Sequence, residues 1–452
     1  MSNPPLNQEQ AFALDLVKRG KNVFITGVAG TGKSFTVARI VEWAEKIGKK
    51  IDVTASTGLA AFLLSGPCKK YCSTFHSWAG IGLGKGNADK LARNMLSKVD
   101  VCAHLREVDI VVIDEISMMN AEYMAKVDVV MKAVRKNPRS PFGGIQIIFC
   151  GDFGQLPPVR RDGSAPIYLF EHPIWKDTVD HCVLLKKVYR QEQEEFVDIL
   201  TRMRDGETTE EDLKLLRETG PVEEINGVRP TVLYSRNRDV DYMNHLELSR
   251  LPGESKVYNA NDIFKHPKAN QEFVKKKFSL PETLELKPGA QVMLLMNYMP
   301  GAGLVNGSRG VVTELGKVRD FVRVMFANGQ DVIVEKHTQE YRDENNALLA
   351  SRQQFPLRLA WSITIHKSQG SSIDRLIANM DGTFETGQAY VALSRARTLD
   401  GLQVKGLERR HIKTSQKVKD FMAGVKNEHD QMMQMFAFSK GGEPEAKRQK
   451  KE

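Results

Sequence analysis

The segment Gly27-Val-Ala-Gly-Thr-Gly-Lys-Ser34 constrains this chain more than any other part of it. It follows a short apolar run, Asn22 to Thr26, and precedes a helical stretch from Phe35 to about Ile47. In that context a glycine-rich loop surrounds a phosphate with backbone N–H groups at a helix N-terminus. We expect every position of the loop to bind nucleotide: Gly27, Val28, Ala29, Gly30, Thr31, Gly32, Lys33 and Ser34, with Ser34 also a Mg²⁺ ligand.

Further short apolar runs predict two α/β domains. The runs at 51–54, 109–113 and 144–150 are separated by segments long enough for crossover helices, which indicates one doubly wound parallel domain over residues 1–185. A second set, at 231–235 and 358–365 with a helix at 386–396, predicts another α/β domain over 186–298 and 352–436. The interruption between them, 299–351, carries alternating strands and the turn Asn328-Gly329, which suits a small SH3-like β-barrel.

Charge and composition narrow the classes of partner. The 452 residues include 65 Lys and Arg against 56 Asp and Glu, a formal net charge of +9. This excess favours a polyanionic partner such as nucleic acid, although solubility alone would also account for it. No stretch approaches the roughly 18 apolar residues of a spanning helix, so we expect no membrane partner.

Cysteines, ends and targeting give further expectations. Five cysteines on a long chain fit reduced thiols, and Cys68, Cys72 and His76 could suggest zinc, but no second ligand pair follows. The start lacks a presequence, a helix is expected from His411 to about Phe436, and residues 437–452 read as a disordered basic tail. Four basic residues in Lys447–Lys451 suit nuclear import or a solvated tail. We expect a nuclear protein, with the mitochondrion as an alternative, or the cytoplasm if the source is viral or bacterial.

Acidic and amide side chains follow two further strands of the first domain. Asp114 and Glu115 end an apolar run, which suits a Mg²⁺ ligand and a base for the attacking water. Gln155, in Gly-Asp-Phe-Gly-Gln after the next run, should reach the same sheet edge and sense the γ-phosphate. Together with Lys33 these residues predict hydrolysis of a nucleotide triphosphate.

Phosphoryl transfer also requires cations near the γ-phosphate. The candidates lie in the predicted second domain, at Arg190 in Val-Tyr-Arg-Gln and at Arg395 in Leu-Ser-Arg-Ala-Arg. Spacing does not choose between Arg395 and Arg397. If these arginines act, ATP lies between two domains.

Two segments have residues suited to nucleic acid. Thr364, His366, Lys367 and Ser368 end an apolar strand with groups that suit a sugar–phosphate backbone. Phe75 and His76, next to Trp78, suit stacking on unpaired bases, although Phe75 and Trp78 could equally be core.

With these residues assembled, the chain resembles the Pif family of 5′-to-3′ DNA helicases in superfamily 1B. The resemblance covers about residues 6–405 and follows the family's order of motifs: LNQEQ, GVAGTGKS, TASTGLAA (54–61), VVIDEISM, the run 141–159, VYRQ, WSITIHKSQG and YVALSRAR (390–397). It implies that Gln10 reads adenine, that Thr57 joins the DNA contacts, and that Arg190 and Arg395 are trans-domain arginines.

The resemblance also implies two RecA-like domains, a small wedge near 79–105, and an ATP- and Mg²⁺-dependent motor on single-stranded DNA and duplex junctions. RNA–DNA hybrids and G-quadruplexes are further implied substrates, in replication, recombination, repair and telomere maintenance, with replication or repair proteins as possible partners. We expect a monomer. The segment 63–76 departs from the family pattern, and Ser372 replaces its usual Thr. An RNA-directed or purely translocating ATPase and an inactive nucleic-acid clamp stay open as alternatives.

Overall fold

The computed structural model describes residues 4–158, 165–191, 193–265, 271–275, 278–316, 319–342 and 348–439. The chain forms two compact units. Unit 1 contains the residues up to Thr208, the short segment Glu385–Tyr390, and the residues from Ile412 onward. Unit 2 contains Thr209–Phe384 and Val391–His411.

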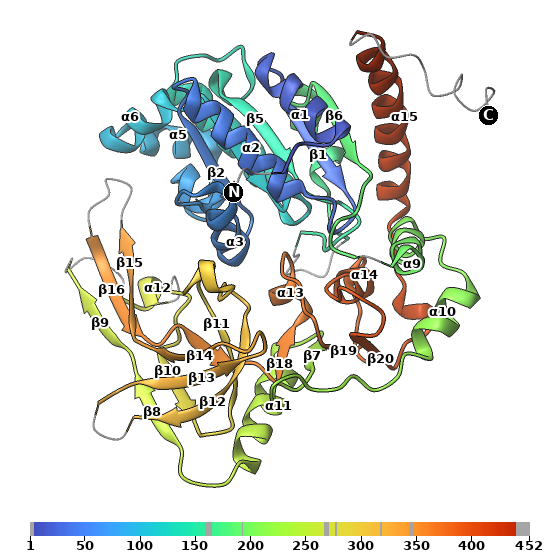
Figure 1. Ribbon diagram of the computed structural model, residues 1–452. Coiled ribbons are helices and arrows are strands. Elements are labelled where there is room, and N and C mark those ends of the chain that lie inside the picture. Colours follow the sequence, from blue (N-terminus) through green and yellow to red (C-terminus); the bar gives the residue numbers. More distant parts are fainter. Residues whose placement is uncertain are drawn as a thin grey trace. The chain divides into compact units, whose positions relative to one another are not determined.

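Unit 1 is built on a six-stranded sheet in the order β3-β2-β4-β5-β1-β6, with every neighbouring pair parallel (Figure 1). This confirms the predicted parallel α/β fold, and the four runs expected in the first domain are strands. The strands are β1 (Val23–Gly27), β2 (Ile51–Ala55), β3 (Ser73–Thr74), β4 (Ile110–Asp114), β5 (Gln146–Cys150) and β6 (His181–Leu185).

Helices cover both faces of this sheet, because alternate strand residues enter two separate hydrophobic clusters. In β4, Val111 faces one cluster and Val112 the other. The helices of unit 1 are α1 (Gln8–Lys18), α2 (Lys33–Lys46), α3 (Gly58–Cys68), α4 (Phe75–Ala79), α5 (Ala88–Leu96), α6 (Val99–Glu107), α7 (Ala121–Val134), α8 (Pro173–Thr178), α9 (Glu194–Asp205) and α15 (Gln416–Ser439), with the 3₁₀ turns η1 (Ile116–Met118), η2 (Pro141–Gly144) and η3 (Leu169–Glu171).

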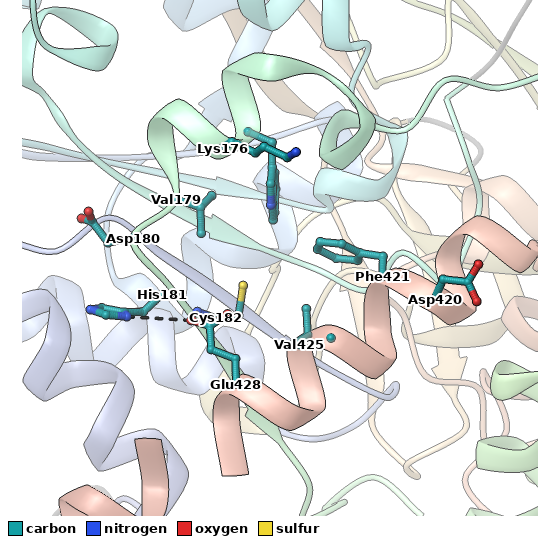
Figure 2. Close-up of a pocket in the computed structure, with 11 residues that line it drawn as sticks. Lys176, Val179, Asp180, His181, Cys182, Asp420, Phe421, Val425 and Glu428 are labelled. Carbon is teal, nitrogen blue, oxygen red and sulfur yellow. Dashed lines mark hydrogen bonds and ion pairs between the residues drawn. The ribbon is translucent and has the colours of Figure 1, made fainter. Parts of the chain in front are cut away.

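The C-terminal helix α15 completes the core of unit 1. The Phe421 ring stacks on Phe170 with centroids 4.2 Å apart. Nearer the C-terminus, the backbone N–H of Cys182 in β6 donates to the Glu428 carboxylate at 3.3 Å. A pocket of about 440 Å³ lies between α8, β6 and α15, with Phe421 and Glu428 on its wall (Figure 2).

The division into units differs from the expected boundaries. Residues 186–208 and 412–436 were expected in the second domain, but they belong to unit 1. The physical reason is packing, since α15 buries aromatic and aliphatic side chains against β6 and α8. The helix also runs to Ser439, three residues into the expected tail, and residues 440–452 lie outside the described part.

Unit 2 contains a four-stranded parallel sheet in the order β18-β7-β19-β20. The strands are β7 (Thr231–Tyr234), β18 (Ser362–Thr364), β19 (Leu376–Asn379) and β20 (Leu402–Lys405). The accompanying helices are α10 (Glu210–Arg217), α11 (Asn237–Arg250), α13 (Ile365–Ser368), α14 (Gln388–Leu393), whose first three residues belong to unit 1, and the 3₁₀ turn η5 (Arg409–His411).

The remainder of unit 2 is β-rich and antiparallel, as the SH3-like prediction required, but it begins at β8 instead of residue 299. Its sheets have the orders β14-β13-β12-β11-β17, β15-β16-β9 and β10-β8. The elements are β8 (Lys256–Asn259), β9 (Asn261–Phe264), α12 (Gln271–Lys275), β10 (Thr283–Leu286), β11 (Gln291–Leu294), η4 (Pro300–Ala302), β12 (Arg309–Leu315), β13 (Val322–Phe326), β14 (Asp331–Val334), β15 (His337–Arg342), β16 (Leu348–Gln354) and β17 (Leu357–Leu359).

The run 358–365, expected as one strand, forms two. Its first part, β17, pairs with β11 in the antiparallel sheet, whereas β18 pairs with β7 in the parallel sheet. Ala360 lies between them and exchanges backbone and side-chain hydrogen bonds with Gln291. Among the helices that the structure describes, none combines the length and apolar character needed to cross a bilayer.

His429 of α15 makes the stability of unit 1 depend on pH. Its Nδ1 accepts a hydrogen bond from the Leu184 backbone N–H at 3.3 Å, and burial lowers its pKa to about 4. An unfolded histidine titrates near about 6.5, so the unfolded chain binds more protons between these values, and stability is lost as pH falls from about 6.5 to about 4.

We therefore expect His429→Asn, which keeps an acceptor near the Nδ1 position, to flatten this dependence. Between pH 6.5 and 4.5 the Tm of the wild type should fall by about 2 to 4 °C more than that of the variant. Thermal unfolding followed by circular dichroism measures both. If the Tm of both proteins fell equally between these pH values, protonation of His429 would make no contribution to the pH dependence of stability.

Candidate functional site

Every candidate residue of unit 1 outside α1 lies at the carboxyl end of a strand in the six-stranded sheet or follows it. The phosphate loop follows β1, Glu115 follows β4, Gln155 lies after β5, and Arg190 lies after β6. The nucleic-acid candidates follow the other two strands, β2 and β3. Since parallel strands end at one edge, the fold alone brings these groups to one side of the sheet.

The lysine of the phosphate loop forms hydrogen bonds with backbone carbonyl groups of the same loop. Gly32 precedes α2 with φ of 82°, a conformation that glycine adopts without strain. The Lys33 Nζ donates to the carbonyl oxygens of Gly27 at 2.8 Å and Val28 at 3.0 Å. Burial lowers the Lys33 pKa, and the negative charge of Asp152 is the foremost opposing influence. A partly buried cation whose partners among the described residues are neutral carbonyls is well suited to exchange them for phosphate oxygens.

The acidic pair after β4 is partly buried and mutually repulsive. Asp114 is 7% exposed, and burial together with the Glu115 charge raises its pKa to about 7. Glu115 has φ of 52°, a left-handed conformation that a non-glycine residue adopts at a cost of order 1–3 kcal/mol. The Asp114 carboxylate and the Ser34 hydroxyl at the start of α2 are hard oxygen donors of the kind Mg²⁺ prefers. Among the described residues no group of three or more His, Cys, Asp or Glu could hold a metal, Cys68 and Cys72 included.

Gln155 is buried with an unused acceptor. Its side chain is 4% exposed, and its Oε1 has no hydrogen-bond partner among the described residues. The backbone N–H of Gln155 donates to the Asp152 carbonyl at 3.0 Å, which fixes the turn after β5. A buried polar group without a partner is costly, and it points to a group that binds during function. The γ-phosphate role of Gln155 stays a prediction.

The N-terminal glutamine lies where a base-reading residue would be needed. Gln10 forms a capping box with Asn7 at the start of α1. A Cβ placed on Gly32 would lie 2.8 Å from the Gln10 Nε2, so the carboxamide is against the phosphate loop. Tyr189, which the sequence did not indicate, lies beside the same glycine, accepts a hydrogen bond from Asn7 Nδ2 at 3.1 Å, and is 51% exposed.

The expectation that Arg190 acts from the second domain is wrong. Arg190 belongs to unit 1, and its Cβ lies 2.5 Å from where a Cβ on Gly30 would be. It therefore reaches the phosphate loop from within the same unit, because β6 continues directly into its loop. Arg395 belongs to unit 2, where its guanidinium is 1% exposed and donates to the Val391 carbonyl at 2.8 Å. Arg397 is exposed and pairs with Asp374.

Of the nucleic-acid candidates in unit 1, Phe75 is a correction. It is fully buried and stacks on Trp78 with centroids 5.5 Å apart, so it belongs to the core and presents no face to a base. His76 is half-buried and its ring lies 4.2 Å from that of Tyr123. Thr57 is the N-cap of α3, where its hydroxyl accepts from the Ala60 N–H.

The nucleic-acid candidates of unit 2 are of two kinds: hydroxyl groups that form hydrogen bonds within α13, and basic side chains that are at least partly exposed. The Thr364 hydroxyl caps α13 by accepting from the Lys367 N–H, and the buried Ser368 hydroxyl donates to the Ile365 carbonyl. Lys367 is exposed and His366 half-buried. Partial desolvation of the exposed Lys367, reinforced by the positive charge of Arg358, lowers the Lys367 pKa.

Arg358 extends this positive region and was not anticipated. It lies in β17 opposite Met293, which on its other side lies opposite Arg309 of β12. The three side chains therefore share one face of the sheet. Burial lowers the pKa of Arg358, and that of Arg309 to about 10. Burial disfavours the positive charge of both arginines, and the negative charge of a bound polyanion would offset that cost. Nothing in the local sequence marks them, because their proximity arises from pairing of distant strands.

Comparison with known proteins shows which proteins this chain is similar to. The family model for PIF1-like helicases matches residues 5–214, and the model for the 2B domain of DNA helicase Pif1 matches residues 272–315. The ATP-dependent DNA helicase PIF1 of Danio rerio is 38% identical over 425 residues, which cover 94% of this chain and 64% of that protein. The chain spans 61% to 65% of the length of the first curated relatives it matches.

Solved structures show the same similarity. The crystal structure of Pif1 helicase from Candida albicans is 35% identical with a TM-score of 0.80, and the match covers 94% of this chain and all of that one. Bacteroides Pif1 in complex with ADP-AlF4 is 30% identical with a TM-score of 0.78, covering 94% and 98%. The same protein bound to single-stranded DNA matches with a TM-score of 0.66, 30% identity and the same coverage. With its parallel six-stranded sheet, its β-rich 2B region and these relatives, the chain belongs to the PIF1-like helicase family.

Proposed function

We propose that this protein is an ATP-dependent DNA helicase that translocates 5′ to 3′ on single-stranded DNA. The observation that carries the proposal is the convergence of Lys33, Asp114, Glu115 and Gln155 at the carboxyl edge of one sheet. Relatives named as ATP-dependent DNA helicases, and family structures with ADP-AlF4 and with single-stranded DNA, support it. The polarity rests on the family resemblance.

In the proposed hydrolysis, the phosphates of ATP replace the carbonyl partners of the Lys33 ammonium. Ser34 and Asp114 would hold Mg²⁺, which supplies charge neutralisation on the phosphate oxygens. Glu115 takes a proton from the attacking water, and Gln155 orients that water or the γ-phosphate. Arg190 adds positive charge from beside Gly30, and Arg395 is proposed to add charge from unit 2.

Each cycle of binding and hydrolysis would alternate the grip of the two units on the DNA backbone. We propose duplex junctions, RNA–DNA hybrids and G-quadruplexes as substrates, in replication, recombination, repair and telomere maintenance, with replication or repair proteins as partners. A nuclear location is part of the proposal. We also propose that one copy suffices for unwinding, which predicts an unwinding rate per enzyme that does not rise with protein concentration.

The first prediction concerns the motor. A duplex with a 5′ single-stranded tail should be unwound in the presence of ATP, a 3′-tailed duplex should not, and Lys33→Ala and Glu115→Gln should abolish unwinding. Gel-based unwinding assays measure this, with a 5′-tailed RNA duplex alongside. Unwinding of the 3′-tailed substrate would overturn the polarity, and preference for RNA would favour an RNA-directed ATPase.

The clamp alternative is tested with the same proteins. DNA-stimulated ATP hydrolysis should be reduced at least 100-fold in Glu115→Gln while nucleotide binding persists, because removing a general base costs about 10² to 10⁴ in rate. If wild type and variant bound DNA equally and neither hydrolysed ATP, the protein would be a clamp.

A second prediction concerns the base of ATP. Tyr189→Ala should raise the KM for ATP about 3- to 10-fold, because an exposed ring beside Gly32 and Gln10 stacks on adenine. Tyr189→Phe keeps the ring, removes only the hydroxyl that pairs with Asn7, and should stay within about twofold of the wild type. Tripolyphosphate, which has no base, should compete equally well in all three proteins. Unequal competition would show that Tyr189 acts on the phosphate loop instead.

A third prediction concerns DNA. Lys367→Ala should weaken binding of oligo-dT about 3- to 10-fold and reduce the slope of log Kd against log salt concentration by about 0.7, the value for one phosphate contact on a single strand. Lys405→Ala removes another exposed lysine, at the end of β20 on the opposite edge of the same sheet, and is the matched control. Fluorescence anisotropy across a salt series measures both. Equal slopes for the two variants would remove Lys367 from the interface.

A further inference from the structure

The hydroxyl of Tyr390 joins two loops of the ATPase site. Tyr390 belongs to unit 1 and is its last residue before the chain enters unit 2. Its Oη accepts a hydrogen bond from the backbone N–H of Ala29 in the phosphate loop at 2.9 Å, and donates to Asp152 Oδ2 in the loop after β5 at 3.2 Å. The exposed fractions of Tyr390, Ala29 and Asp152 are 2%, 6% and 0%, so water does not readily replace these bonds.

Asp152 is held from its other side as well. Its Oδ1 accepts from Arg204 Nε on α9 at 2.9 Å and from the Gly154 N–H at 3.0 Å. The Asp152–Arg204 ion pair is buried, with 0% and 7% side-chain exposure. Asp152 thus has three donors, while the nearby Lys33 ammonium donates to backbone carbonyls. This arrangement keeps the carboxylate from capturing the lysine that phosphate requires.

The chain before Tyr390 is shaped to bring it there. Gly387 has φ of +74°, and a Cβ on it would lie 2.5 Å from the carbonyl oxygen of Gln155 and 2.6 Å from that of Gly154. Its N–H donates to the Lys413 carbonyl at 2.9 Å. Only glycine permits so close an approach of two backbones with this conformation. The segment Glu385–Tyr390 is therefore packed directly on the loop that carries Asp152 and Gln155.

We propose that Tyr390 is a positioning residue for nucleotide binding, which fixes the phosphate loop to the Asp152–Arg204 pair through a bridge of two buried hydrogen bonds. The inference deepens the proposed function, because it rests on ATP binding by this loop. Tyr390 does not touch the reacting atoms in this scheme. Its contribution is to keep the Ala29 backbone, and with it the N–H groups that follow, in the geometry that phosphate requires.

The test variant is Tyr390→Phe, which retains the ring and removes only the bridging oxygen. The Ala29 N–H is then left buried without this acceptor, and Asp152 loses one donor. The matched control is Tyr258→Phe in unit 2, since the Tyr258 hydroxyl is also buried but has no hydrogen-bond partner in the described part of the chain. Both variants remove one buried tyrosine hydroxyl.

Titration with a fluorescent ADP derivative should give a Kd about 5- to 20-fold higher for Tyr390→Phe, and one within about twofold of wild type for Tyr258→Phe. In DNA-stimulated ATP hydrolysis the KM for ATP should rise by a similar factor while kcat stays within about twofold. Hydrogen–deuterium exchange in the peptide spanning 27–34 should accelerate in Tyr390→Phe alone. A general loss of folding would accelerate exchange in the peptides of α15 as well.

The outcomes separate this inference from the proposed function. If wild type binds and hydrolyses ATP but Tyr390→Phe matches Tyr258→Phe in Kd and exchange, the positioning role is overturned and the ATPase stands. If kcat falls with unchanged KM, Tyr390 acts on the chemical step and the proposal is also overturned. If wild type itself binds no nucleotide, the proposed function fails first.

Discussion

The common carboxyl edge of six parallel strands is the constraint on which the site depends. In the order β3-β2-β4-β5-β1-β6, the strands that precede nucleotide candidates are four neighbours, and those that precede nucleic-acid candidates are the other two. The two groups meet between β2 and β4, where Ala55 pairs with Asp114. Thr57 is two residues beyond Ala55. Only one strand boundary therefore separates the residues proposed to contact DNA from those proposed to bind the metal and activate water.

Burial gives the charges at this edge their properties. Burial disfavours the charged form of each group, which raises the pKa of Asp114 to about 7 and lowers that of the partly buried Lys33. A folded state that accommodates such groups unliganded forgoes stability, which binding of ATP and a cation can restore. Asp152 is the exception, because Arg204 neutralises it within the protein. Asp114 and Lys33 are therefore the groups whose charges a bound ligand would stabilise, whereas Asp152 and Arg204 already neutralise each other. Tyr390 forms its hydrogen bond with this ion pair, through Asp152.

The sequence alone predicted those features whose conformation depends on a few consecutive residues. The glycine loop, the acids after β4 and the hairpin at Asn328-Gly329 each consist of a short run whose chemistry and conformation are inseparable. Domain boundaries were not predictable in this way. Arg190 lies just beyond the boundary predicted at residue 185, whereas its contact with Gly30 and the bond from Arg204 of α9 to Asp152 hold this segment in unit 1. Phe75 had the composition of a base-stacking residue, and only its complete burial identifies it as core.

The contacts that the sequence did not indicate join residues far apart in the chain. Tyr390 is 361 residues from Ala29, and Arg204 is 52 residues from Asp152. Tyr189 and Arg358 likewise acquire their surroundings from other strands and loops. No periodicity or spacing encodes such pairs, because register, sheet order and helix docking all have to be fixed before they exist. The motif YVALSRAR includes Tyr390, but the motif alone does not indicate which residues its hydroxyl contacts.

The discontinuity of unit 1 has a consequence for biosynthesis. The phosphate loop and its sheet are complete near residue 185, yet the aromatic cluster around Phe24 and Trp175 receives Phe421 only from α15. During translation the ribosome must therefore synthesise all of unit 2 before unit 1 can close its core. Until α15 has been synthesised, the edge strand β6 lacks the helix that packs against it. An uncovered edge strand can form non-native backbone hydrogen bonds with another strand. Unit 1 is therefore the first unit whose synthesis begins and the last whose core is completed.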